Sequence, residues 1–202
     1  LERLNIKSDF IDGLRVTGAD TVEIVEMVLS GGINKGIVAA INRAGGRAIG
    51  LSGKDANLIR ASKLGHKTRD SDSNIEKIID LGFVGKPEEV NGQVLAELAR
   101  TGVTPVIAPV GFDAAGNTYN INADTAAGAV ASAVKAKRLL MLTDVAGVLD
   151  ANGKRIEDIA ADTARRMINE GVIKGGMIPK IETCLEAVAA GVEAAVILDG
   201  RV

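Results

Sequence analysis

The segment GGMIPKIETCLEAVAAG, residues 175–191, combines residue types that suit phosphate binding. Two adjacent glycines precede a helical pattern, and Pro179 and Lys180 stand in its opening turn. Glycine lets the backbone approach a ligand closely, the first amides of a helix point at an anion, and proline costs little where an N–H has no intrahelical partner. Lys180 adds a positive charge where ordinary capping places Ser, Asp or Asn. The pattern indicates a phosphate site, and a tight turn followed by a solvated lysine fits it equally well.

A second polar cluster, YNINAD, comes just before an alanine-rich helical pattern over residues 122–136. Asn122 suits the N-cap and Asp124 suits the helix dipole, so capping alone accounts for both. A carboxylate near Lys180 could also hold that ammonium group in place. Asn120 precedes the cap and could project its side-chain amide into a cleft.

Two further stretches place polar residues beside strand ends. In MLTDVAGVLD a buried strand ends in Thr-Asp before a glycine loop, which is where open α/β sheets bind ligands. Asp144 could equally cap the turn there. In GLRVT, Arg15 stands beside a strand-to-helix loop and could hold a carboxylate bidentately. An isolated arginine is more often a surface residue, so Arg15 alone is a weak signal.

Several other kinds of chemistry are disfavoured. His66 and Cys184 are the single histidine and cysteine, too few for a tetrahedral zinc site, and His66 reads as a solvated loop residue. GLSGKD is no Walker motif, because its first glycine is misplaced and Asp55 takes the Ser/Thr position. The 24 basic and 26 acidic residues give a net charge of -2, and aromatics make up 2%, which argues against nucleic-acid binding.

Helical and strand-like segments alternate along the 202 residues. This predicts a three-layer α/β/α sandwich around a mainly parallel open sheet. The predicted helices cover residues 19–31 (closed by Gly31 and Gly32), 33–45, 91–102, 122–136, 162–171 and the segment after Gly176, and the predicted buried strands cover residues 48–53, 104–111, 138–145 and 194–200. A polar stretch over residues 58–85 predicts exposed hairpins or a lid-like excursion, and residues 112–120 predict a hairpin or long loop. The start of the chain predicts the tail of a helix leading into a strand over residues 9–16.

Composition also predicts where the protein works. One cysteine excludes an internal disulfide and favours a reducing compartment. The start is not a signal peptide, and no apolar run approaches the length that crosses a bilayer. We therefore expect a cytoplasmic protein with neither nucleic acid nor membrane as a partner.

The pieces GLRVTGADTVEIVEMVLSG, LSGKDANLIR, DLGFVGKPEEVN, APVGFDAAGNTYNINADTAAGAVA, LLMLTDVAGVLD and GGMIPKIETCLEA occur in this order. Together they resemble the amino acid kinase family, over essentially the whole chain. The resemblance implies an N-terminal lobe over residues 1–110 that holds the amino acid and a C-terminal lobe over residues 111–202 that holds the nucleotide. It also implies ATP-dependent phosphorylation of the side-chain carboxylate of N-acetyl-L-glutamate to N-acetyl-L-glutamyl 5-phosphate, a step of arginine biosynthesis. Mg²⁺ would enter with ATP, and no protein-bound metal is expected.

The resemblance assigns roles motif by motif. Arg15 would grip the substrate α-carboxylate, Asn120 would bind the same ligand, Asp124 would organise the catalytic lysines and Lys180 would stabilise charge on the transferring phosphoryl group. The nucleotide site would be lined by Asp144, Val145, Ala146, Gly147, Val148 and Leu149 together with Val172, Ile173, Lys174, Gly175 and Gly176. A homo-oligomer and L-arginine as a feedback inhibitor are further implications.

The chain departs from the family's pattern at both ends. The family's first strand, with a phosphate-binding lysine, and its downstream glycine-rich loop are absent from these residues, as is the segment after DGRV. We therefore expect weak or no kinase activity from these 202 residues alone. Two alternatives stay open: a family member with another acidic acceptor such as aspartate, and a non-catalytic module that serves oligomer contacts or arginine sensing.

Overall fold

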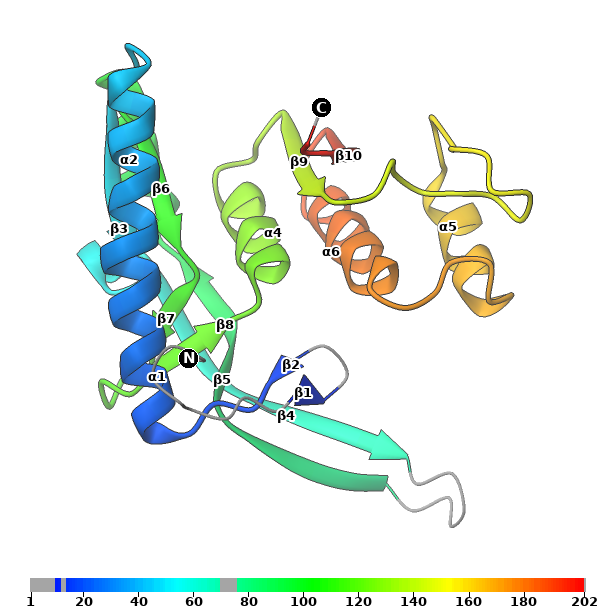
Figure 1. The fold of residues 1–202 in the computed structure, drawn as a ribbon, viewed down its shortest axis with the longest axis horizontal. Helices are drawn as coiled ribbons and strands as arrows, with labels where there is room; N and C mark the ends of the chain where they lie inside the picture. Colours follow the sequence, from blue (N-terminus) through cyan, green and yellow to red (C-terminus); the bar gives the residue numbers. More distant parts are fainter. Residues whose placement is uncertain (1–9, 12–13, 70–75, 202) are drawn as a thin grey trace. The chain divides into compact units, whose positions relative to one another are not determined.

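The computed structural model describes residues 10–11, 14–69 and 76–201 (Figure 1). The chain divides into two compact units, residues 1–126 and residues 127–202. The predicted lobe boundary at residues 110 and 111 stays a prediction. The helix tail predicted at the start of the chain falls on residues 1–9, outside the described residues, and the strand expected after it is a short hairpin of β1 (Phe10–Ile11) and β2 (Leu14–Arg15).

The first unit carries one long helical segment rather than the two helices that were predicted. It consists of α1 (Ala19–Glu26), the π-helix η2 (Met27–Ile33) and α2 (Asn34–Arg43). The prediction that Gly31 and Gly32 close a helix was wrong. Glycine within a helix costs only about 0.5–1 kcal/mol relative to alanine, and wider π-turns carry the chain through this pair.

This helical segment contradicts the prediction that no apolar stretch of the chain approaches the length needed to cross a bilayer. Residues Ala19–Arg43 are long and apolar enough to cross a membrane by length and composition, with a mean hydropathy of 1.5 over the best 18-residue window, of which 11% is buried. Contacts along the segment are those of a helix packed on a sheet: Asn34 is 2% exposed and donates to the carbonyl oxygens of Leu51 (3.2 Å) and Val106 (2.8 Å). Such a helix is weak evidence for a membrane span.

The strands that Asn34 contacts are the parallel pair β3 (Ala48–Ser52) and β6 (Thr104–Ala108). Helix α2 runs alongside this pair (Figure 1). Gly50 makes the approach possible, because a Cβ at this position would lie 1.8 Å from Asn34 Oδ1. Between β3 and β6 the chain passes through the 3-10 turn η3 (Asp55–Asn57), two further strands and helix α3 (Gly92–Arg100). Helices and parallel strands therefore alternate in this unit, as predicted for an α/β fold.

Replacing Asn34 with leucine is expected to lower the free energy of unfolding by about 1–3 kcal/mol, because two strand carbonyls would lose a buried donor. Urea unfolding followed by circular dichroism measures this change. The matched control is Gln93→Leu, an exposed helical amide in α3, which should stay within about 0.5 kcal/mol of the parent. Equal midpoints for the two variants would contradict the assigned role of Asn34.

The remaining strands of the first unit form a small closed barrel, in the order β4, β5, β8, β7. Their bounds are β4 (Ile59–Arg69), β5 (Glu76–Val90), β7 (Val110–Phe112) and β8 (Thr118–Ile121). The hairpin predicted for residues 58–85 is the antiparallel pair β4–β5, and the hairpin predicted for residues 112–120 joins β7 to β8. Leu58, Ile59, Leu81 and Val110, which lie in or next to these strands, are 0% exposed.

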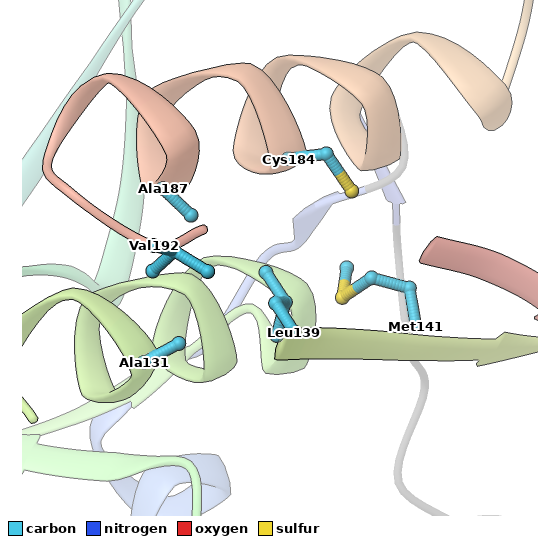
Figure 2. Packing of buried hydrophobic residues seen from close by; sticks show 6 residues of the cluster. All are labelled: Ala131, Leu139, Met141, Cys184, Ala187 and Val192. Atoms are coloured by element: carbon cyan, nitrogen blue, oxygen red, sulfur yellow. The ribbon is translucent and has the colours of Figure 1, made fainter. Parts of the chain in front are cut away.

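The second unit is built on the parallel pair β9 (Arg138–Thr143) and β10 (Ala194–Asp199), with helices α5 (Ala161–Asn169) and α6 (Met177–Ala189). Helix α4 (Ala123–Ala133) begins in the first unit and ends in the second. One core cluster contains Ala131, Leu139, Met141, Cys184, Ala187 and Val192, shown in Figure 2. The prediction that residues 138–145 form a buried strand holds for one face only, since Leu140 and Leu142 are 57% and 64% exposed.

Candidate functional site

Two residues predicted to bind substrate lie together in the first unit. Arg15 and Asn120 line one hollow of about 210 Å³. The remaining lining is apolar and comes from the helical segment: Ile24, Val25, Val28 and Leu29. A guanidinium and a side-chain amide beside an apolar wall are suited to a small acid that carries both a carboxylate and an amide or apolar group.

Strand β5 brings Arg15 and Asn120 together although they are far apart in sequence. Asn120 in β8 pairs with Val84 of β5. Arg15 is tied to the same strand through Thr17, whose amide donates to the carbonyl oxygen of Leu81 at 3.0 Å and whose own carbonyl accepts from Phe83 N–H at 2.7 Å. Two strands docked at adjacent positions of one neighbour present their side chains close together.

Two residues make this docking tight. Thr17 is 0% exposed, and its hydroxyl donates to the carbonyl oxygen of Arg15 at 3.0 Å. Gly82 stands opposite it with a φ of 73°, and a Cβ there would lie 2.2 Å from the Thr17 carbonyl oxygen. Only glycine meets both conditions, the left-handed backbone and the close approach. The backbone that carries Arg15 is therefore held in place by the contacts of Thr17 with β5.

Capping at the start of α4 is as predicted. Asn122 Oδ1 accepts from the backbone amides of Asp124 at 2.9 Å and Thr125 at 3.2 Å. Asp124 lies in the first turn of the helix, where its charge complements the dipole. A capping role is thus established for Asn122, while the catalytic role of Asp124 stays a prediction.

Tyr119, the residue before Asn120, is held by the turn that joins β7 to β8. It is 7% exposed, and its hydroxyl donates to Asp113 Oδ2 at 3.0 Å. Asp113 also accepts from the Asn117 side chain at 2.8 Å and from two backbone amides. These hydrogen bonds lower the pKa of Asp113, with the Asn117 side chain the largest cause. Burial, and then the Asp113 carboxylate, raise the pKa of the Tyr119 phenol.

The Asp113→Asn variant is expected to lower the pKa of Tyr119 toward its ordinary value of about 10, while burial keeps it above that value. Tyr119 is the single tyrosine and the chain has no tryptophan, so phenolate absorbance at 295 nm reports on this residue alone. Because the raised pKa belongs to the folded state, its stabilising contribution is complete below about pH 10 and is lost as pH rises through the folded-state value. An unchanged titration midpoint in Asp113→Asn would contradict the contact.

In the second unit the helix that begins after Gly175 and Gly176 is confirmed. Gly175 adopts a φ of 61°, Gly176 is the N-cap of α6, and no side chain caps this end of the described helix. Pro179 and Lys180 follow within its first residues, as predicted from the sequence. The Ile178 amide donates to the Gly175 carbonyl oxygen at 3.1 Å and Pro179 has no N–H, so the amides of Gly176 and Met177 are the ones that could meet an anion at this helix start.

The two segments predicted to bind nucleotide meet in a single core of the second unit. Val148 is 8% exposed and Ile173 3% exposed, and they pack with Ala164 and Ile181. The side chains of Val148 and Ile173 therefore serve packing, whereas those of Val145 and Leu149 are 42% and 43% exposed. Asp144, by contrast, is exposed directly after β9, where the strand-end pattern predicted it.

Beside these segments lies a hollow of about 560 Å³. It is lined by Ala146, Arg155, Ile156, Glu157, Val196, Ile197, Leu198 and Asp199. Hydrogen bonds from Arg201, at 2.9 Å and 2.7 Å, lower the pKa of Asp199 to about 2, so this carboxylate is charged at neutral pH. Within residues 10–11, 14–69 and 76–201, no group of three His, Cys, Asp or Glu side chains is placed to hold a metal ion.

Sequence reasoning missed the apolar wall of the Arg15 hollow. Its residues form two pairs at i, i+4 spacing, Ile24 with Val28 and Val25 with Leu29, which lie on one face of a helix. That spacing can be read from the sequence, but ordinary core packing produces the same i, i+4 pattern. Only the fold, which puts these residues and Arg15 on one hollow, distinguishes a binding wall from core packing.

Comparison with known proteins supports one family. The family described as "Amino acid kinase family" matches residues 1–199. The chain is 63% identical over 202 residues to the acetylglutamate kinase of Gluconobacter oxydans (strain 621H) and 65% identical to that of Rhodospirillum centenum (strain ATCC 51521 / SW). These alignments take in 100% of the chain, and they span 68% and 66% of the two relatives, so the chain covers about two thirds of their length.

Solved structures agree with this placement. The structure of smu.665 from Streptococcus mutans UA159 superposes with a TM-score of 0.83 at 33% identity, covering 98% of this chain and 76% of that one. The N-acetylglutamate synthase of Neisseria gonorrhoeae, complexed with coenzyme A and N-acetyl-glutamate, has a TM-score of 0.80 at 22% identity, covering 98% of this chain and 43% of that one. At that identity the second likeness supports the fold alone. The chain belongs to the amino acid kinase family, and its close relatives are acetylglutamate kinases.

Proposed function

We propose that the whole protein transfers the γ-phosphoryl group of ATP to the side-chain carboxylate of N-acetyl-L-glutamate, a step of arginine biosynthesis. The observation that carries this proposal is identity of 57–65% to acetylglutamate kinases along the full chain. Neither an alternative acceptor such as aspartate nor a non-catalytic module is favoured by these relatives.

The hollow in the first unit suits the acceptor. We assign the α-carboxylate to Arg15, because a guanidinium forms a bidentate pair with a carboxylate. The side-chain amide of Asn120 lies on the same hollow and can hydrogen-bond the acetamido group. The apolar wall formed by Ile24, Val25, Val28 and Leu29 completes a surface for a substrate that is charged at one end and apolar at another.

Transfer to a carboxylate needs little acid–base machinery. A glutamate-type carboxyl group has a reference pKa of about 4.3, so it is already ionised near neutral pH and needs no general base. Catalysis is then positioning plus stabilisation of charge on the phosphoryl group. This supports the assignment of Lys180, at the glycine-preceded start of α6, to the transferring phosphoryl group, with Asp124 as the residue that organises it.

We place ATP in the second unit. The exposed Asp144 after β9, the loop to Leu149 and the backbone from Val172 to Gly176 supply the polar groups, and the hollow beside Ala146 supplies space. Mg²⁺ would enter with ATP and lie between phosphate oxygens rather than in a dedicated protein cage.

We also propose a cytoplasmic homo-oligomer that L-arginine inhibits. The support for self-association is a set of apolar side chains exposed on the long helical segment outside the Arg15 hollow: Met27, Ile33 and Ile37, between 46% and 64% exposed. A second copy of the chain that buried this face would remove them from water. Sedimentation equilibrium of the wild type and of an Ile33→Lys/Ile37→Lys variant tests this proposal. The wild type should form an oligomer and the variant should dissociate, and a monomeric wild type would contradict the proposal.

The function is tested by ADP release from the whole protein with MgATP and three acceptors, N-acetyl-L-glutamate, L-glutamate and L-aspartate. Turnover that requires the acetylated acceptor is expected, and hydroxylamine trapping should detect the acyl phosphate. Turnover with L-aspartate or L-glutamate instead would replace the proposed acceptor.

A further inference from the structure

Glu26 connects three separate elements of the first unit. Its carboxylate oxygens Oε1 and Oε2 each lie 2.8 Å from Lys54 Nζ. Oε2 also accepts a hydrogen bond of 3.3 Å from the Thr118 hydroxyl. Glu26 ends α1, Lys54 lies in the turn after β3 and Thr118 opens β8, so one carboxylate joins a helix, a turn and a barrel strand.

Both partners of Glu26 are fixed beside Asn120. Thr118 precedes Asn120 by two positions in β8, so the two side chains point to the same side of the strand. Lys54 follows Gly53, whose amide donates to the carbonyl oxygen of Val110 at 2.7 Å, and Val110 pairs with Asn120. A Cβ at Gly53 would lie 2.0 Å from that same oxygen, so the turn sits directly on the strand pair.

The other side of this connection is the apolar wall. Val25 directly precedes Glu26, and Val28 and Leu29 follow it within the next turn of the helical segment. All three line the hollow that Arg15 and Asn120 share. Glu26 therefore sits between the wall and the strand that carries Asn120, and its contacts set the distance between them.

We propose that Glu26 and Lys54 form a positioning pair that holds the apolar wall and Asn120 in the geometry that binds the acceptor. This rests on the proposed function, since it assigns the hollow to N-acetyl-L-glutamate. The pair acts through other residues and touches no reacting atom. Its side chains are part-exposed, at 39% for Lys54 and 28% for Glu26, and ion pairs of that kind contribute little to stability. Variants that lack the pair should consequently fold.

The experiment compares steady-state kinetics of the whole protein with Glu26→Gln and Lys54→Met. Each substitution is expected to raise the KM for N-acetyl-L-glutamate about three- to tenfold, because small misplacement of binding groups weakens a site. kcat and the KM for ATP should stay within about twofold. The double variant should match the larger single effect rather than the product of the two, since both break one interaction. Lys54→Arg, which keeps the charge, should restore most of the affinity.

Glu23→Gln is the matched control, because Glu23 is an exposed glutamate on the same helix. It should leave every constant unchanged. An unchanged KM in Glu26→Gln and Lys54→Met, or an equal rise in Glu23→Gln, would overturn the positioning role. Variants in which kcat and the urea unfolding midpoint both fall while the KM stays constant would also overturn it, because a pair that only stabilises the fold would give that result.

A readout independent of turnover separates this proposal from the proposed function. The side-chain amide resonances of Asn120, followed by NMR without any ligand, should shift in Glu26→Gln and not in Glu23→Gln. Wild-type protein that releases no ADP with N-acetyl-L-glutamate would refute the proposed function. An Asn120 amide that does not respond to Glu26→Gln would refute the positioning pair, whatever the wild-type activity.

Discussion

The Lys180→Ala variant of the whole protein is expected to lose about 10²–10³-fold in kcat, the scale seen when one preorganised charge-stabilising group is removed. Lys180 stands in the opening turns of α6, after two exposed glycines and at an end that no side chain caps. An ammonium group there acts on charge that develops during transfer, so its loss should appear in the rate. The KM for N-acetyl-L-glutamate should change by less than about threefold, because Lys180 does not contribute to binding of the acceptor in the ground state.

Single-turnover and steady-state assays with MgATP measure this effect. Lys137→Ala is a suitable control, because Lys137 is an exposed lysine of the same unit just before β9. Its kcat should match that of the wild type. If Lys180→Ala turned over at the wild-type rate, Lys180 would be an ordinary solvated lysine and the phosphate assignment of GGMIPK would fail.

The Arg15→Ala variant is expected to show the opposite pattern, a KM for N-acetyl-L-glutamate raised about 10- to 100-fold with kcat within about threefold. Hydrogen bonds to a charged group are worth about 1.5–3 kcal/mol, and each 1.4 kcal/mol is a factor of ten. The Arg15 backbone is fixed by Thr17 and Gly82, so truncating the side chain should leave the fold intact.

Isothermal titration of N-acetyl-L-glutamate into the protein measures the binding term directly. Arg15→Lys should fall between wild type and Arg15→Ala, because an ammonium keeps the charge but loses the bidentate geometry. Arg60→Ala, an exposed arginine of the same unit whose side chain is 54% exposed, is the control and should bind normally. Normal binding by Arg15→Ala would remove Arg15 from the acceptor site.

Local signals of the chain identified most elements and several site residues. Alternation of helical and strand patterns predicted β3, α3, α5 and β10 near their observed bounds, whereas the single strand predicted over residues 104–111 divides into β6 and the start of β7. Asn122 was readable as an N-cap because capping depends on residues three apart. The start of α6 was readable for the same reason, since Gly-Gly followed by Pro179 is a local backbone signal. These are interactions over a few residues, which sequence order preserves.

Other features followed from contacts between distant residues. The sequence predicts a helix end at Gly31 and Gly32, yet the helix continues through them, because Asn34, two residues after Gly32, donates hydrogen bonds to two strand carbonyls and holds this part of the helix on the sheet. The closed barrel depends on pairings between β5 and β8 and between β4 and β7 that no local pattern encodes. Long-range pairing of this kind is decided by which combination buries the core, not by any one strand.

The candidate site likewise combines features that neighbouring residues predict with features that depend on contacts between distant residues. Amino-acid order alone shows an arginine after a strand, an asparagine before a cap and a lysine in a glycine-preceded helix, and through these motifs it indicates the family. The fold brings them together: β5 holds Thr17, two residues after Arg15, at Gly82 and holds Asn120 at Val84, so that Arg15 and Asn120 line one hollow. It also decided that Glu26 reaches Lys54 and Thr118, because a side chain's neighbours across a fold are set by packing rather than by position along the chain.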